Sequence, residues 1–240
     1  MGIGTPFRTE REDLAMKYRI RLELLHRRHA SDLSDAGNDP EIWWYLPGQA
    51  FRHSRDASNW IDQALVEYEN GRRIPYAIIN AGNGKAIGST SLMNLRKVHR
   101  GVEIGWTWLG RAYRRNRFNT ESKYLLMQHA FEAMDAVRVE IKADERNLAS
   151  QRALERLGAT REGVLRSHMI MPDGHTSNSV YYSVMAEEWP NLKVSLEDFL
   201  GMTTSSSMPA IVSEPADFEA KAYGLALERI EQIPALSECR

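Results

Sequence analysis

The sequence has little material for covalent cross-links or for crossing a membrane. Its 240 residues contain one cysteine, Cys239, so no disulfide bond can form within the chain. This suits a reducing compartment, because disulfide-bonded proteins occur mainly outside the cytoplasm. No apolar run approaches the roughly 20 residues that a membrane-spanning helix requires, and the charged stretch from Met1 to Ile20 lacks the apolar core of a secretory signal. The sequence therefore predicts a cytoplasmic protein.

An excess of charge of either sign is also missing. The chain has 31 Lys and Arg against 32 Asp and Glu, a formal net charge of -1. Such a balance gives no general attraction for nucleic acid or for an anionic membrane surface. With 42% hydrophobic residues, the chain can bury a full core without a metal or a disulfide. We expect no nucleic-acid partner, no membrane partner and no metal.

Hydrophobic periodicity predicts strands and helices in an order typical of a mixed sheet. Strands are expected at 18–24, 75–80, 86–95, 101–109, 137–142, 164–171 and 179–186, and helices at 29–37, 56–69, 119–135 and 147–157. Consecutive strands followed by strand–helix alternation indicate an α/β (α+β) domain, with a mixed, mostly antiparallel central sheet flanked by helices. The expected core stripe of the 119–135 helix is Phe118, Ser122, Leu126, Ala130, Ala133, Met134 and Val137.

The ends of the chain differ in composition from its middle. We predict an N-terminal lead (1–16), a single domain (17–201), and a linker with a C-terminal helical extension (202–240). The linker is the Ser-rich stretch 203–209, which is typical of a flexible connection. Beyond it, a weak helical stripe is formed by Ala216, Ala220, Tyr223, Leu227 and Ile230. This helix could pack on its own domain, join two copies in a homodimer, or bind another partner.

A strand that runs into a basic loop and then a long helix is the first feature that indicates chemistry. The strand 101–109 is followed by a loop containing Arg114, Arg115 and Arg117. Unpaired backbone N–H groups and the helix dipole meet at such a junction and can bind an anion. Arginines add charge suited to a pyrophosphate. The alternative is an ordinary solvated basic loop.

Three stretches resemble one known family. Residues 103–109 with 119–123 look like the GNAT superfamily, and within it the branch of the ribosomal-protein N-terminal acetyltransferases. Residues 144–159 are similar to that branch's Asn-x-x-Ser helix, which ends in glycine. Residues 162–168, followed by 173–174 and 188–190, make the third match. The matches lie in the expected order and cover about Tyr18 to Gly201.

The resemblance implies a site for acetyl-CoA, used as a cosubstrate. In the family, the loop after the third consecutive strand holds the CoA pyrophosphate, and the strand end before it lies along the pantetheine. The residues that this assigns to cofactor binding are Trp108, Leu109, Arg114, Arg115, Asn116, Arg117, Phe118, Asn119, Thr120 and Asn147. The chain departs from the family pattern at Arg117, where glycine is usual, and at Asn119, where Gly or Ala is usual. Asn147 is also expected to cap its helix.

Aminolysis of a thioester needs a donor for the departing sulfur, and Ser150 is the candidate. Many GNAT enzymes use a tyrosine seven residues after the helix-starting asparagine, but that position here is Leu154. The resembled branch offers a serine three residues after the asparagine, which is Ser150. A hydroxyl near the sulfur can donate to the leaving thiolate. The alternative is a serine that merely lies in the first turn of a helix.

The amine must also lose a proton, and Glu103 is the candidate base. Strand alternation predicts Glu103, Gly105 and Thr107 on one face, and Val102, Ile104 and Trp106 on the other. A partly buried glutamate could accept the proton directly or through water. The alternative is a glutamate that satisfies neighbouring polar groups. Weaker candidates for the base are His168 and Glu140.

Taken together, these features predict an N-acetyltransferase that acts on a primary amine, either a protein N-terminus or a small molecule. The mechanism expected is direct attack in a ternary complex, because the one cysteine lies in the tail and an acyl-cysteine intermediate is disfavoured. Trp43, Trp44 and Tyr45 precede the helix that flanks the acceptor cleft in the family, and belong either to the core or to the acceptor site. The competing function is a non-catalytic CoA-binding or scaffolding module with the same fold.

Overall fold

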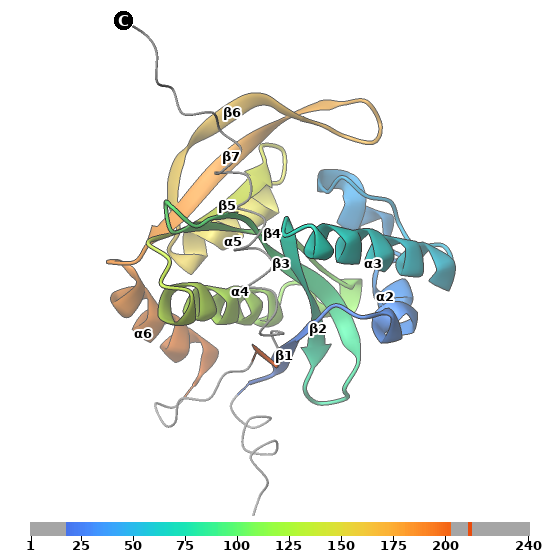
Figure 1. Ribbon diagram of the computed structural model, residues 1–240, viewed down its shortest axis with the longest axis horizontal. Helices are drawn as coiled ribbons and strands as arrows, with labels where there is room; N and C mark the ends of the chain where they lie inside the picture. Colours follow the sequence, from blue (N-terminus) through green and yellow to red (C-terminus); the bar gives the residue numbers. More distant parts are fainter. Residues whose placement is uncertain (1–17, 203–210, 213–240) are drawn as a thin grey trace, which may run out of the picture.

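The computed structural model describes residues 18–202 and 211–212 (Figure 1). Its strands are β1 (Ile20–Leu24), β2 (Arg73–Asn80), β3 (Ala86–Arg96), β4 (Gly101–Leu109), β5 (Arg138–Asp144), β6 (Thr160–Ile170), β7 (Thr176–Met185) and β8 (Ile211–Val212). The α-helices are α2 (Ala30–Ala36), α3 (Ser54–Glu69), α4 (Phe118–Gln128), α5 (Leu148–Leu157) and α6 (Trp189–Leu200). Short helical segments are η1 (Arg27–His29), η2 (Pro40–Tyr45), η3 (Arg111–Tyr113) and the π-helix η4 (His129–Ala133).

The strands form one open sheet in the order β6-β7-β5-β4-β3-β2-β1-β8. Neighbouring strands are antiparallel except for two pairs, β4 with β5 and β1 with β8. The connection from β4 to β5 is a crossover through α4, as parallel neighbours require. The predicted mixed, mostly antiparallel sheet with flanking helices is confirmed.

Each face of the sheet carries its own hydrophobic core. The core on the α2–α3 face includes Leu33, Ile61 and Trp108, together with Trp43 from η2. The opposite face is covered by α4, α5 and α6, and its core is the larger one. Figure 1 shows α2 and α3 on one side of the sheet and α4 with α6 on the other.

The predicted core stripe of the long helix is wrong in part. Ala133 is exposed and Val137 is 39% exposed, whereas Glu121 and Tyr124, which lie off the stripe, are fully buried. The reason is that α4 is covered on several sides: the Glu121 carboxylate accepts the Arg19 N–H at 2.6 Å, and the Tyr124 hydroxyl donates to Glu197 at 2.6 Å. The helix also widens into η4, which shifts the phase of its last turn.

The C-terminal part contains two elements that we do not predict from the sequence, α6 and β8. Met202, one residue past the predicted boundary, is buried, and its N–H donates to the Glu197 carbonyl at 2.9 Å. Ile211 and Val212 then pair with β1 in parallel. The sheet therefore continues beyond the predicted domain end at Gly201. The predicted N-terminal lead, the stretch 203–209 and the helical stripe of the extension lie outside the described residues.

Candidate active site

A gap between β4 and β5 is the centre of the candidate site. The two strands pair only from Gly101 with Arg138 to Ile104 with Ile141. Beyond that point β4 continues to Leu109 and β5 to Asp144 without pairing to each other. The edge of β4 that faces β5 therefore has backbone groups that an extended ligand arm could bind. The two strands therefore separate beyond Ile104 and Ile141.

A bulge in β4 changes which side chains face each side of this gap. Ser91 pairs with Gly105 but Ser89 pairs with Trp108, so β4 has an extra residue here. Trp106 takes a left-handed conformation with φ of 49°. Past the bulge, the Thr107 hydroxyl lies 2.8 Å from that of Thr90, whose strand partner Tyr76 belongs to the core under α4.

The predicted alternation of β4 is therefore wrong beyond Gly105. Thr107 does not share a face with Glu103. Trp106 does not share a face with Val102 and Ile104; its ring instead contacts Arg73, on the face that carries Glu103. Trp108 is buried on that same face, against the rings of Trp43 and Trp60. Leu109 is buried in the opposite core.

The basic loop after β4 is held by its own arginines. Arg114 donates to the Leu109 carbonyl at 3.1 Å and pairs with Asp39 at 2.6 Å and with Glu41 at 3.4 Å. Its guanidinium therefore ties the loop to η2, on the α2–α3 face. Arg115 is exposed, and its φ of 57° turns the backbone sharply just before α4. Arg115 is thus the more accessible charge for an anion.

The helix α4 begins directly after this basic loop. Asn116, just before the N-cap residue Arg117, accepts the Phe118 N–H with its Oδ1 at 3.0 Å. Arg117 donates to the Leu200 carbonyl at 3.3 Å and lies over the Phe199 ring, so it links α4 to α6. The N–H groups of Asn119 and Thr120 belong to the first turn, before the intrahelical ladder begins. This is the geometry of an anion site at a helix N-terminus.

The helix after β5 confirms the predicted cap and stop. Asn147 Oδ1 accepts the Ser150 N–H at 3.0 Å, and Gly158 ends the helix with φ of 95°. The Ser150 hydroxyl forms no hydrogen bond within residues 18–202 and is partly exposed. Leu154 is 1% exposed and belongs to the core. The position of the usual tyrosine is therefore filled with apolar packing, while Ser150 presents its hydroxyl at the helix start.

Glu103 lies where β4 and β5 separate, on the α2–α3 face, and is 1% exposed. Its Oε2 accepts the Asn94 amide N–H at 2.6 Å. Lys142, the first residue of β5 beyond the last β4–β5 pair, places its Nζ 2.8 Å from Oε1, an ion pair at an angle unsuited to a hydrogen bond. One carboxylate oxygen of Glu103 thus keeps its hydrogen-bonding capacity.

The two weaker candidates for the base already have partners. Burial favours the neutral form of Glu140, but hydrogen bonds from Arg138 and Arg96 outweigh it and hold the pKa of that carboxyl below its usual range. His168 shares a hydrogen bond of 2.9 Å with the Ser179 hydroxyl and packs edge-on against Tyr181. Of the three candidates, Glu103 is the one beside the gap with a carboxylate oxygen that accepts no hydrogen bond from the described residues.

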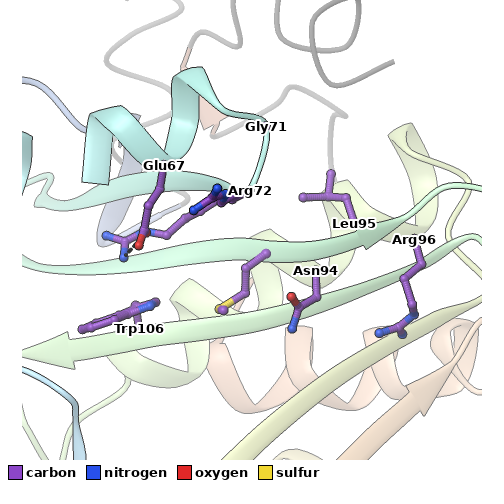
Figure 2. Close-up of a pocket in the computed structure, with 9 residues that line it drawn as sticks. Glu67, Gly71, Arg72, Asn94, Leu95, Arg96 and Trp106 are labelled. Atoms are coloured by element: carbon purple, nitrogen blue, oxygen red, sulfur yellow. Dashed lines mark hydrogen bonds and ion pairs between the residues drawn. The ribbon is translucent and has the colours of Figure 1, made fainter. Parts of the chain in front are cut away.

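A pocket of about 530 Å³ opens on the face that carries Glu103. It is lined by Glu67, Gly71, Arg72, Arg73, Met93, Asn94, Leu95, Arg96 and Trp106. Figure 2 shows Trp106 and Glu67 at one end, Arg96 at the other, and Asn94 between them. Asn94 also binds Glu103, so the pocket and the candidate base share a residue. Glu103 itself does not line the pocket, and Asn94 links the two.

Arg73 forms the wall of the pocket near Trp106. Its guanidinium lies between the rings of Trp60 and Trp106, with its Cζ 5.5 Å and 4.9 Å from the ring centroids, and donates to Glu67 at 3.1 Å. Burial lowers the pKa of Arg73 to about 10, against the opposing effect of Glu67. These contacts fix the Trp106 ring, and with it the bulge in β4.

Several of these residues are missing from the sequence prediction. Lys142 could have been found, because alternation along β5 places it on the same face as Glu140, which pairs with Glu103. The Arg73–Trp106 contact could not, because it depends on the bulge. The aromatic segment divides: Trp43 is buried in the core, Trp44 is 60% exposed, and Tyr45 lies under the Arg146 guanidinium.

Comparison with known proteins decides the family. The sequence profile of the family described as acetyltransferase (GNAT) domain matches residues 19–160. The chain belongs to the GNAT acetyltransferase family. It is therefore an acyltransferase, of the N-acetyltransferase class.

Individual GNAT relatives agree with this. One relative is YdaF of Bacillus subtilis, which is provisionally named a ribosomal N-acetyltransferase. It is 33% identical over 111 residues, which are 46% of this chain and 60% of YdaF. A structure from T. thermophilus, provisionally described as an acetyltransferase, is 38% identical with a TM-score of 0.70, over 76% of this chain and 94% of that one. A GCN5-related N-acetyltransferase from Brucella melitensis has a TM-score of 0.72 at 25% identity, over 85% and 91%. YdaF supports the resemblance to the ribosomal-protein branch.

The residues present fit the CoA cosubstrate that GNAT enzymes use. The gap offers backbone groups to a pantetheine arm, and the start of α4 offers N–H groups and Arg115 to a pyrophosphate. Within residues 18–202 and 211–212, no three His, Cys, Asp or Glu side chains gather in a way that could hold a metal ion. The helices in the same ranges are too short or too polar to cross a membrane.

Proposed function

We propose that this GNAT protein is an acetyl-CoA-dependent N-acetyltransferase that acetylates a primary amine by direct attack in a ternary complex. One observation carries the proposal: the β4–β5 gap connects an anion site at the start of α4, on one face of the sheet, to Glu103 and its pocket on the other. Cosubstrate and acceptor can therefore approach from opposite faces and meet in the gap.

When bound, acetyl-CoA would supply an activated acetyl group as a thioester. The first turn of α4 and Arg115 would bind its pyrophosphate, with Arg114 holding the loop in shape and the backbone near Trp108 and Leu109 lying along the pantetheine. Asn147 has an amide N–H₂ that could donate to the same arm while its oxygen caps α5. Backbone N–H groups of β4 in the gap would polarise the thioester carbonyl.

Glu103 would take the proton of the amine, either directly or through one water molecule. The neutral nitrogen then attacks the carbonyl carbon, the new C–N bond forms and the C–S bond breaks. Ser150 would donate its hydroxyl hydrogen to the departing sulfur, and the second proton lost by the nitrogen would restore that hydroxyl, so that CoA leaves as its thiol. Lys142 holds Glu103 in place, since the two form an ion pair where β4 and β5 separate.

The acceptor is either a protein N-terminus or a small-molecule amine. The pocket beside Glu103 supports acceptor binding on this face, and its size allows a few residues of a peptide or one small molecule. The provisional name of YdaF supports a protein acceptor. A cytoplasmic location and a homodimer remain predictions. A non-catalytic scaffold is not favoured, because the family is one of acetyltransferases.

Calorimetry and initial-rate kinetics test the proposal. Acetyl-CoA should bind the wild type, and Arg115→Ala should weaken that binding about fivefold while leaving pantetheine binding unchanged, because a charge-assisted contact to phosphate is lost. Arg52→Ala removes an exposed arginine elsewhere and is the matched control. Double-reciprocal plots should intersect, as a ternary complex requires. Parallel plots, or no binding of acetyl-CoA, would contradict the proposal.

A further inference from the structure

Within residues 18–202, Lys123 is a buried cation without a counter-charge. It is 6% exposed, and its Nζ donates to Asn119 Oδ1 at 2.7 Å. It pairs with no carboxylate in that range, and an amide oxygen carries no net charge. Burial lowers the pKa of Lys123 to about 8, so the ammonium is still the main form at neutral pH. A charge in this setting is costly unless an anion joins it.

The helix makes the cost higher. Because side chains on a helix lean toward its N-terminus, Lys123 reaches back one turn to Asn119, the second residue of α4. The N-terminus is the positive end of the helix dipole, where a cation is unfavourable and an anion is stabilised. Arg115 and Arg117 add further positive charge to the same turn.

The direction of Lys123 around α4 can be derived from Glu121. The Glu121 carboxylate accepts N–H groups of Arg19 and Ile20, so that side of α4 faces β1. Two residues further along a helix lie about 200° away around its axis. Lys123 therefore points away from β1, and the strand order places β4 and β5 on the same side of β1 as the rest of the sheet.

We propose that the Lys123 ammonium is the internal counter-charge for the phosphate groups of the CoA-type cosubstrate, and that Asn119 holds it in position. This rests on the function proposed above. It also explains why Asn119 stands where Gly or Ala is usual in the resembled family: an amide oxygen there gives the ammonium a hydrogen bond before the ligand arrives. The ammonium thus has no counter-charge among residues 18–202 until the phosphates bind.

The test is Lys123→Met, which keeps the length of the side chain and removes the charge. Without ligand, the variant should unfold at a higher urea concentration than the wild type, because an uncompensated buried charge is gone. Its affinity for acetyl-CoA, by calorimetry at pH 7, should fall at least about tenfold, the loss expected for a charge-assisted contact. Binding of pantetheine, which has no phosphate, should be unchanged.

The matched control is Lys193→Met on α6, which changes the net charge equally but removes a partly exposed lysine paired with Glu132. It should be no more stable than the wild type and should bind acetyl-CoA equally well. Should Lys123→Met fail to fold, Lys123→Gln gives the same comparison with a polar side chain.

Two results would contradict the role of Lys123 as a counter-charge. One is an acetyl-CoA affinity equal to that of the wild type. The other is a ligand-free variant of lower stability that loses acetyl-CoA and pantetheine affinity alike, which indicates a structural role. These results leave the proposed function standing, because the wild type still binds acetyl-CoA. If the wild type itself fails to bind, the proposed function and the counter-charge both fall.

Discussion

The place that a tyrosine occupies in many GNAT enzymes is filled here by Leu154, which is buried in the core under α5. A phenol cannot act from that position, so the leaving sulfur needs another donor. Ser150 is one turn nearer the start of the same helix, with its N–H fixed by Asn147 and its hydroxyl uncommitted within the described part of the chain. On the acceptor side, Glu103 is buried, with one oxygen hydrogen-bonded to Asn94 and the other paired with Lys142.

At Ser150, replacement by alanine separates chemistry from binding. Ser150→Ala should lower turnover on the order of 10- to 100-fold, because the hydroxyl acts mainly as charge develops on sulfur. The dissociation constant of acetyl-CoA should stay within about threefold, under 1 kcal/mol. Ser195→Ala, an exposed helix serine on α6, is the control and should be fully active. Full activity in Ser150→Ala would show that Ser150 is not the donor to the sulfur. A loss of acetyl-CoA affinity as large as the loss of turnover would show that Ser150 binds the cosubstrate instead.

For Glu103, the informative readout is the pH profile. Glu103→Gln should lower turnover by about 100-fold or more, as for the loss of a general base, and should abolish the fall in rate at acidic pH. Acetyl-CoA affinity should be retained. Lys142→Met removes the same ion pair but leaves the carboxylate, so it should keep the acidic limb. If the rate of Glu103→Gln still falls at acidic pH, another group is the general base.

Among the elements, β4 determines the geometry of the site. Its bulge at Trp106 sends Thr107 to one face and Trp108 to the other, and the strand leaves β5 just before that point. The bounds of β4 were predictable, because β-branched and aromatic residues fill 101–109 between a Gly and a loop. The bulge was not, since it comes with a contact between the Trp106 ring and Arg73 of another strand. Alternation within one strand contains no information about such a contact.

The bulge predicts an order of stability for two variants that is the opposite of the usual strand preference. Trp106→Val and Trp106→Asn both remove the ring from Arg73, but only asparagine tolerates the positive φ at this position. The valine variant should therefore be less stable by about 1 kcal/mol in urea unfolding. Ordinary strand propensity favours valine over asparagine. A more stable valine variant would mean that the backbone relaxes to a regular strand.

At the scale of the whole molecule, local signals in the sequence predicted most elements, and contacts between elements decided the rest. The Asn147 cap and the Gly158 stop act within one helix, so both were predictable. The burial of Glu121 on α4 was not, because β1 covers that side of the helix. The same applies to the candidate site: the sequence pointed to Glu103, Ser150 and the basic loop, and alternation along β5 could have added Lys142, while Lys123 and the pocket required the fold.

The division of the chain is tested by truncation after Met202. The shortened protein should fold and bind acetyl-CoA, because residues 18–202 already form a buried core on each face of the sheet. It should melt a few degrees lower, since β8 adds only the pairing of Ile211 and Val212 to the edge of β1. An insoluble fragment, or one that loses acetyl-CoA binding, would show that the rest of the chain belongs to the catalytic unit.

The central claim is acetyl transfer to an amine from a thioester held in the β4–β5 gap. Its most direct test is mass spectrometry of a peptide library and a panel of small amines after incubation with acetyl-CoA carrying a labelled acetyl group. We predict at least one amine that gains the labelled acetyl mass with wild-type protein, with free CoA released in equal amount and with both signals reduced in Ser150→Ala and Glu103→Gln. Tight binding of acetyl-CoA without labelled product across the whole panel would contradict the claim.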